Sequence, residues 1–211
     1  MIQTTPVLLC LAMLPLVAVA ETANHERHAA QSWTTFSGYK TKITVPRVTL
    51  HDSEGREQEL PRLMHNRVVI LNFVFTSCST ICPMLSAIMH ATEQRLAKRL
   101  GKGVILISIS VDPVNDTPER LHAYAKKIGS GSNWYWLTGR PVDISHALRA
   151  FGVPTGGRPK NHPPTILVGN TTTGQWLRWV GMATPENLIN AVDTVTDNTS
   201  HNNKRSHAQQ R

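Results

Sequence analysis

The fold is decided by the stretch Val68-Val69-Ile70-Leu71-Asn72-Phe73-Val74-Phe75 and by the run Thr76-Ser77-Cys78-Ser79-Thr80-Ile81-Cys82-Pro83 that follows it. The first part is almost entirely β-branched, aliphatic or aromatic, which is typical of a central strand that is covered on both faces. Apolar residues then recur at helical spacing from Pro83 to Leu100, so a helix is expected there. The sequence therefore places two cysteines on a strand-to-helix turn.

Cys78 and Cys82 are four positions apart, and this spacing on one helical turn would bring both sulfurs close enough to share a metal or to form a disulfide. The free N–H groups at a helix N-terminus favour a thiolate at Cys78 and, by the same reasoning, at Cys82. A disulfide across so short a loop would stabilise the fold only modestly, so redox or metal chemistry is the better interpretation. A structural disulfide or two buried thiols is the alternative.

The elements around this turn predict one α/β domain with a thioredoxin-like fold, a central mixed sheet flanked by helices with an N-terminal β-hairpin. The hairpin turn is Asp52-Ser53-Glu54-Gly55. A second strand at 104–111 completes a βαβ unit, and Asp116 or Thr117 is expected to cap the next helix. The remaining elements are expected in this order: a strand at 134–137, a helix at 144–151, strands at 165–168 and 175–180, and a helix from Thr184 to about Thr196.

The first twenty residues carry no charged side chain and end in Ala18-Val19-Ala20, which predicts a secretory signal peptide that is cleaved after Ala20. An uncleaved N-terminal membrane anchor is the alternative. Residues 21–37 are then a linker, 38–197 the folded domain and 198–211 a disordered tail. An exported chain would reside in the periplasm or another extracytoplasmic space, where a lone cysteine pair points to redox or metal chemistry.

The formal net charge of +8 is spread along the chain, and no dense basic block is interleaved with aromatic residues. This pattern does not favour nucleic-acid binding, although an acidic partner surface would be compatible with it. The roughly 190 residues after Ala20 are enough for one domain with a sizeable core.

His162 is the candidate for a third ligand, because it directly precedes a strand whose entry faces the cysteine turn in a thioredoxin-like sheet. Two thiolates and one imidazole suit copper in either oxidation state. Pro164 would be the cis proline that often lies beside the active cysteines in such folds. Met84 is expected to pack within the site and Met89 within the core. The histidines at 90, 122 and 146 are expected on helix surfaces.

Three motifs resemble those of the Sco/SenC family of thioredoxin-like copper proteins, and they occur in the family's order over roughly residues 38–196. They are the run from Thr76 to Pro83, the segment Ser110-Val111-Asp112-Pro113 with Asp116-Thr117-Pro118-Glu119, and Asn161-His162 before a strand. The resemblance implies that Cys78, Cys82 and His162 bind one copper ion, as Cu(I) or Cu(II). It further implies assistance in assembling the CuA site of cytochrome c oxidase, with a CuA-bearing subunit as the recipient close to a membrane.

A copper metallochaperone requires no covalent turnover, so the resemblance leaves enzyme activity open. The alternative is an extracytoplasmic thiol–disulfide oxidoreductase, in which Cys78 attacks a partner disulfide and Cys82 resolves the mixed disulfide. A peroxidase is a distant third interpretation, because no arginine is placed by motif to activate a peroxide.

Overall fold

The stretch Val68–Val74 forms β4, and all seven of its residues are buried. This strand lies in the middle of a sheet that has eight strands in the described part of the chain. The parallel strands β4, β5 (Val104–Ser110) and β6 (Trp134–Thr138) lie side by side, whereas β7 (Thr165–Asn170) runs antiparallel to β4. The predicted mixed sheet is therefore confirmed. In spatial order the strands are β1 (Tyr39–Thr41), β8 (Gln175–Val180), β7 (Thr165–Asn170), β4, β5 (Val104–Ser110), β6 (Trp134–Thr138), β2 (Thr49–Asp52) and β3 (Glu57–Glu59).

This computed structural model describes residues 38–155 and 161–208, with side chains described up to residue 197. The predicted signal peptide at 1–20 and the linker at 21–37 lie outside the described residues. Within the two described ranges, no helix combines the length and the apolar character needed to cross a membrane.

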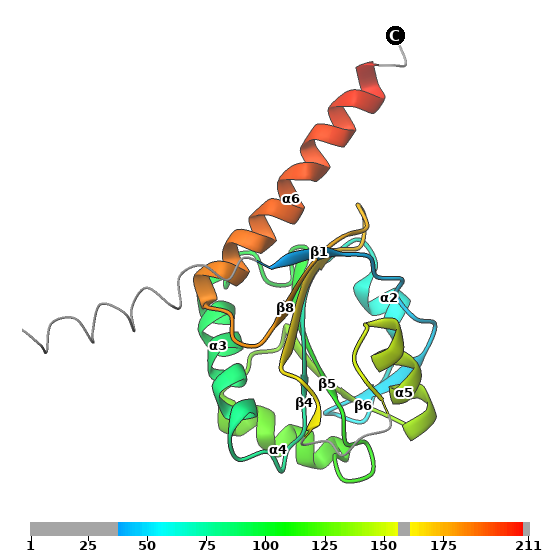
Figure 1. The fold of residues 1–211 in the computed structure, drawn as a ribbon, viewed down its shortest axis with the longest axis vertical. Coiled ribbons are helices and arrows are strands. Elements are labelled where there is room, and N and C mark those ends of the chain that lie inside the picture. The colour runs from blue at the N-terminus through cyan, green and yellow to red at the C-terminus, as the bar shows by residue number, and fades with distance from the viewer. Residues whose placement is uncertain (1–37, 156–160, 209–211) are drawn as a thin grey trace, which may run out of the picture. The chain divides into compact units, whose positions relative to one another are not determined.

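Helices cover both faces of the sheet. On one face lie α3 (Ile81–Arg95), α4 (Pro118–Ile128) and α6 (Pro185–Ala208), and on the opposite face lie α2 (Leu60–Met64) and α5 (Pro141–Ala150) (Figure 1). Alternate residues of β4 serve the two cores: Ile70 packs with the first group of helices and Leu71 with the second. Each fully buried side chain of this size contributes about 1.5–3 kcal/mol relative to an exposed one.

The predicted N-terminal hairpin is formed by β2 and β3, which pair in antiparallel fashion. The Asp52 side chain organises the turn, because its Oδ1 accepts hydrogen bonds from the backbone N–H groups of Glu54 and Arg56, each at 2.9 Å. The hairpin joins the sheet through β2, which pairs with β6. β1 instead pairs with β8 at the opposite edge of the sheet, so the segment before the hairpin reaches both edges.

Helix α6 is longer than the sequence analysis predicted. It begins at Pro185, as expected, but continues past Thr196 to Ala208, into the segment that was expected to be a disordered tail. Residues 197–208 contain neither glycine nor proline, so the chain has no residue that forces a helix to end there. The domain limits themselves stay predictions.

The topology brings three segments together at the edge of the sheet that is formed by the carboxyl ends of β4 and β5. The parallel strands β4 and β5 both end there, and β7 begins there, since Ile166 pairs with Asn72 near the end of β4. The cysteine turn after β4, the loop after β5 and the segment that carries His162 therefore meet at this edge. All peptide bonds in the described ranges are trans, so the prediction of a cis Pro164 is wrong and the intrinsically preferred isomer is present.

Candidate metal centre

Cys78 and Cys82 are both unpaired thiols, and both are buried at the junction of β4 and α3. Cys82 lies in the first turn of α3, which begins at Ile81, whereas Cys78 precedes the helix. The two residues are close because the backbone N–H of Cys82 donates a hydrogen bond to the Cys78 Sγ at 3.3 Å. The predicted proximity is correct, but it arises from this contact and not from a shared helical face.

The Cys78 sulfur takes the place of a helix cap. Thr80 occupies the N-cap position of α3, yet its side chain makes no capping hydrogen bond. Burial alone would raise the pKa of Cys78. Hydrogen bonds from the side chain and backbone N–H of Cys82, and from the backbone N–H groups of Thr80 and Ile81, outweigh burial and hold the pKa of this thiol below its usual value. The predicted thiolate character of Cys78 follows from this arrangement.

Cys82 behaves in the opposite way, and the extension of the thiolate prediction to it is wrong. Burial is the largest cause that raises the pKa of Cys82 to about 12, and its hydrogen bond with Cys78 adds to the shift. The negative charges of Cys78 and Asp116 oppose ionisation further, while a backbone hydrogen bond from Phe75 acts in the other direction. The pair is therefore asymmetric, with one sulfur ready to ionise and the other protonated at neutral pH.

His162 is a neutral imidazole with an unused nitrogen. Burial lowers the pKa of His162 to about 4, and its ring lies edge-on to Phe73 with a centroid separation of 6.0 Å. The Nε2 atom is buried, and no hydrogen-bond partner for it exists among the described residues. A neutral imidazole nitrogen without a protein partner is the form in which histidine binds a metal. The donor set therefore fits a soft metal cargo such as copper.

The three predicted ligands lie at the same edge of the sheet, but they are not all close enough to one another to coordinate one metal ion. Across the described ranges, no group of three histidine, cysteine or acidic side chains is close enough to hold a metal ion. His162 lies against Phe73, the strand residue five positions before Cys78. The segment 156–160, which precedes His162, lies outside the described residues. The structure thus places the cysteines together and His162 nearby.

Asp116 has a role at this site that was not predicted from the sequence, while the helix cap predicted for Asp116 or Thr117 is formed by Thr117. Thr117 is the N-cap of α4, and its side chain accepts a hydrogen bond from the backbone N–H of Arg120. Asp116 is completely buried and receives hydrogen bonds from Thr76 and Ser110 instead. The motif Asp-Thr-Pro-Glu looks like an ordinary helix start, so spacing alone gave no signal of this role.

The two methionines near the site differ from each other. Met89 is fully buried in the core, as predicted, whereas the Met84 side chain is 54% exposed. The expectation that Met84 packs within the site is therefore wrong, because its position on α3 faces solvent. The helix-surface placement of His122 and His146 is confirmed, since both are exposed.

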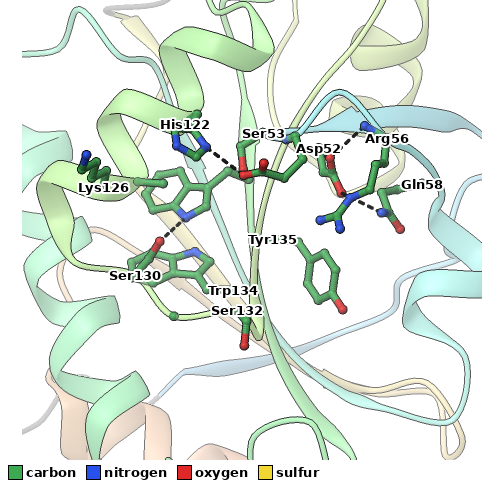
Figure 2. A pocket seen from close by; sticks show the side chains of 14 residues that line it. Asp52, Ser53, Arg56, Gln58, His122, Lys126, Ser130, Ser132, Trp134 and Tyr135 are labelled. Carbon is green, nitrogen blue, oxygen red and sulfur yellow. Dashed lines mark hydrogen bonds and ion pairs between the residues drawn. The ribbon is translucent and has the colours of Figure 1, made fainter.

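A separate cavity of about 740 Å³ lies between the β2–β3 hairpin, α4 and the start of β6 (Figure 2). His122 on α4 and Glu54 on the hairpin approach one another beside it, with the Nδ1 and Oε1 atoms 2.8 Å apart. Trp136 also lines it and donates its indole N–H to the Ser130 hydroxyl. Neither cysteine nor His162 lines this cavity, so the residues that carry thiol and metal chemistry lie outside it.

Residues 38–175, well over half of the chain, match the SCO1/SenC family. The chain belongs to the SCO1/SenC family. The SCO1 protein homolog of Bacillus subtilis (strain 168) is 38% identical over 92 residues, which cover 43% of this chain and 47% of that protein. Protein SCO1 homolog 1, mitochondrial, of Arabidopsis thaliana is 31% identical over 117 residues, 56% of this chain and 34% of that protein. The chain thus spans about half or less of the length of these curated relatives.

Solved SCO1/SenC structures share the fold. BsSco, a member of the Sco family of cytochrome c oxidase assembly proteins in which a disulfide switch was identified, has a TM-score of 0.63 and 27% identity, covering 76% of this chain and 97% of its own. Arabidopsis thaliana ScoI with copper bound has a TM-score of 0.58 and 22% identity, covering 79% of this chain and 99% of its own. These likenesses confirm the predicted thioredoxin-like fold.

Proposed function

We propose that this SCO1/SenC protein is a copper metallochaperone that carries one copper ion between Cys78, Cys82 and His162. Copper is the cargo, and we propose that it is delivered to the CuA-bearing subunit of cytochrome c oxidase. The observation that carries the proposal is the combination of two free sulfurs on the β4–α3 turn with a neutral imidazole nitrogen at the same edge of the sheet, for which the described residues supply no hydrogen-bond partner. Copper is bound in the structure of Arabidopsis thaliana ScoI, which supports copper as the cargo. BsSco belongs to a family of cytochrome c oxidase assembly proteins, which supports the oxidase as the recipient.

The pKa asymmetry explains how such a site would load and unload. Copper bound by both sulfurs displaces the proton of Cys82, whose pKa is raised to about 12 by burial. Loading therefore releases a proton, and reprotonation of Cys82 favours release of the metal. A ligand that returns readily to its protonated form suits a carrier better than a permanent metal site.

Delivery to CuA would occur outside the cytoplasm. The apolar, uncharged start of the sequence, which ends in Ala18-Val19-Ala20, supports export by a signal peptide, and an N-terminal anchor in the membrane is the alternative. A cleaved signal peptide would release the domain into the extracytoplasmic space, whereas an anchor would hold it near a membrane-bound recipient.

Thiol–disulfide exchange is a second candidate function, and the lowered pKa of Cys78 against the raised pKa of Cys82 favours it. The Cys78 thiolate would attack a partner disulfide, forming a mixed disulfide and releasing one partner thiolate. Cys82 would then lose its proton and attack the Cys78 sulfur. The Cys78–Cys82 disulfide forms, and the second partner thiol leaves in reduced form.

Copper stoichiometry of the reduced protein separates these functions. A metallochaperone binds one equivalent of copper, and Cys78→Ser and Cys82→Ser each abolish tight binding and weaken the sulfur-to-copper charge-transfer absorption of the Cu(II) form. An oxidoreductase forms a mixed disulfide with partner when Cys82 is replaced by serine. Weak copper binding that is equal in wild type and both serine variants would contradict the metallochaperone.

A further inference from the structure

Asp116 is a buried carboxylate directly behind the cysteine turn, and the hydrogen bonds that neutral groups donate to it favour its negatively charged form. Its side chain has no exposed surface. The backbone N–H of Thr76 donates to Oδ1 at 3.1 Å and the Thr76 hydroxyl donates to the same oxygen at 2.6 Å. The Ser110 hydroxyl donates to Oδ2 at 2.6 Å. Through these contacts the carboxylate ties the turn after β4 to the end of β5.

Thr76 directly follows Phe75 in the chain, and the backbone of Phe75 contacts both cysteines. The carbonyl oxygen of Phe75 accepts a hydrogen bond from the Cys78 backbone N–H at 3.1 Å, and Phe75 also makes a backbone hydrogen bond to the Cys82 thiol. Asp116 therefore fixes the peptide segment against which both sulfurs are held, from a position forty residues further along the chain.

The charge of Asp116 is not balanced by a cation in the described part of the chain, where every ion pair involves other acidic residues. Its hydrogen-bond donors are neutral groups on Thr76 and Ser110. The negative charge of Asp116 raises the pKa of Cys82 and of Tyr124, because it disfavours a further negative charge on either group. The site thus contains a fixed negative charge in addition to its sulfurs.

We propose that Asp116 is a positioning residue whose buried charge biases the cysteine site toward Cu(II) over Cu(I). This inference rests on the proposed copper function. Two thiolates with Cu(I) carry a net charge of minus one, whereas two thiolates with Cu(II) are neutral. A nearby carboxylate disfavours the more negative state, so it lowers the affinity for Cu(I) relative to that for Cu(II).

Asp116→Asn separates charge from geometry. The asparagine Oδ1 can still accept both hydrogen bonds from Thr76, and its Nδ2 can donate to the Ser110 hydroxyl, so the turn is retained while the charge is lost. We expect the ratio of Cu(I) to Cu(II) affinity to rise about tenfold, equivalent to an increase of about 59 mV in the one-electron potential. Ser110→Ala, which keeps the charge and removes one donor, is the control and should leave the ratio within about twofold of wild type.

The experiment measures both affinities by competition in the full chain for wild type, Asp116→Asn and Ser110→Ala. A purely structural role predicts an unchanged ratio in Asp116→Asn, and that result would overturn the inference. If Asp116→Asn does not fold, Asp116→Ser, which leaves room for a water between Thr76 and Ser110, is measured in its place with the same expectation.

A copper-free measurement distinguishes failure of this inference from failure of the proposed function. Without the Asp116 charge, the reduced pair with an ionised Cys78 is more stable, so the Cys78–Cys82 disulfide of Asp116→Asn should be reduced more readily by glutathione than that of wild type. If wild type fails to bind copper but this shift is present, the copper function is wrong and the electrostatic role of Asp116 stands. If wild type binds copper and neither shift occurs, only the role of Asp116 is wrong.

Discussion

The backbone N–H of Cys82 points to the Sγ of Cys78 at a distance of 3.3 Å, so the first turn of α3 is capped by a sulfur. This contact makes the two thiols chemically unequal. Cys78 is favoured as a thiolate by the free N–H groups of the helix, whereas Cys82 stays protonated because it is buried.

Alkylation should therefore discriminate between the cysteines. In the reduced protein at pH 8, we expect iodoacetamide to modify Cys78 at least about tenfold faster than Cys82, because the thiolate is the reactive form. Mass spectrometry of peptides from a time course measures the two rates. Replacing Cys82 with alanine removes one hydrogen bond to the Cys78 sulfur and should slow modification of Cys78. Equal rates at the two cysteines would contradict the assigned asymmetry.

Copper affinity should rise with pH, because binding by both sulfurs displaces the Cys82 proton. One displaced proton corresponds to about a tenfold gain in apparent affinity per pH unit below the pKa of that thiol. Competition with a chelator of known pH dependence, at several values between pH 6.5 and 8.5, measures the slope. A flat profile after correction for the chelator would show that Cys82 is not a ligand.

Metal-free stability should fall as the solution is acidified from pH 6.5 to 4. The folded-state pKa of His162 is lowered by burial to about 4, below its usual 6.5, so the unfolded chain binds a proton that the folded chain does not. The stability is fully present above pH 6.5 and is lost progressively below it. We expect this histidine to account for about 2 kcal/mol over that window, after allowance for the part of its ring that meets solvent.

Urea unfolding of wild type and His162→Gln across this range isolates the histidine. The difference between the two proteins should depend on pH, with wild type losing more stability in acid. The exposed His146 provides the control, since His146→Gln should retain the wild-type dependence. Parallel stability curves for wild type and His162→Gln would refute the assigned burial of the neutral ring.

Asp52→Ala should destabilise the fold by about 2–3 kcal/mol, because it removes the buried carboxylate that accepts several hydrogen bonds in the hairpin turn. Asp52 is only 2% exposed, and it accepts hydrogen bonds from the backbone of Glu54 and Arg56 and, at 2.8 Å, from the Gln58 side chain. Chemical denaturation measures the loss. Ser53→Ala, in the same turn, serves as the control and should stay within about 0.5 kcal/mol of wild type.

The sequence predicted the parts of this structure that depend on local pattern. The buried strand before Cys78, the helix after it and the hairpin turn at Asp52 follow from periodicity and from the residues that favour turns. The properties that depend on packing between distant segments were not predictable in this way. Burial raises the pKa of Cys82, although the N-terminus of a helix would by itself lower it. Asp116 accepts a hydrogen bond from Thr76, forty residues earlier in the chain, and does not cap its own helix.

His162 shows the same limit. Because His162 directly precedes a strand, it was predicted to lie at the edge of the sheet where the cysteine turn is. The antiparallel pairing of β7 with β4 explains this position. Its contact with Phe73 and the absence of a hydrogen-bond partner for its Nε2 among the described residues depend on side-chain packing that spacing does not encode.

We propose that Cys78, Cys82 and His162 share one copper ion, and electron paramagnetic resonance of the Cu(II)-loaded protein is the sharpest test of this claim. Wild type and His146→Ala should show the same spectrum, with hyperfine coupling to one imidazole nitrogen and a sulfur-rich environment. In His162→Ala the nitrogen coupling should disappear, with Cu(II) affinity falling by at least about tenfold. An unchanged spectrum and affinity in His162→Ala would contradict the claim.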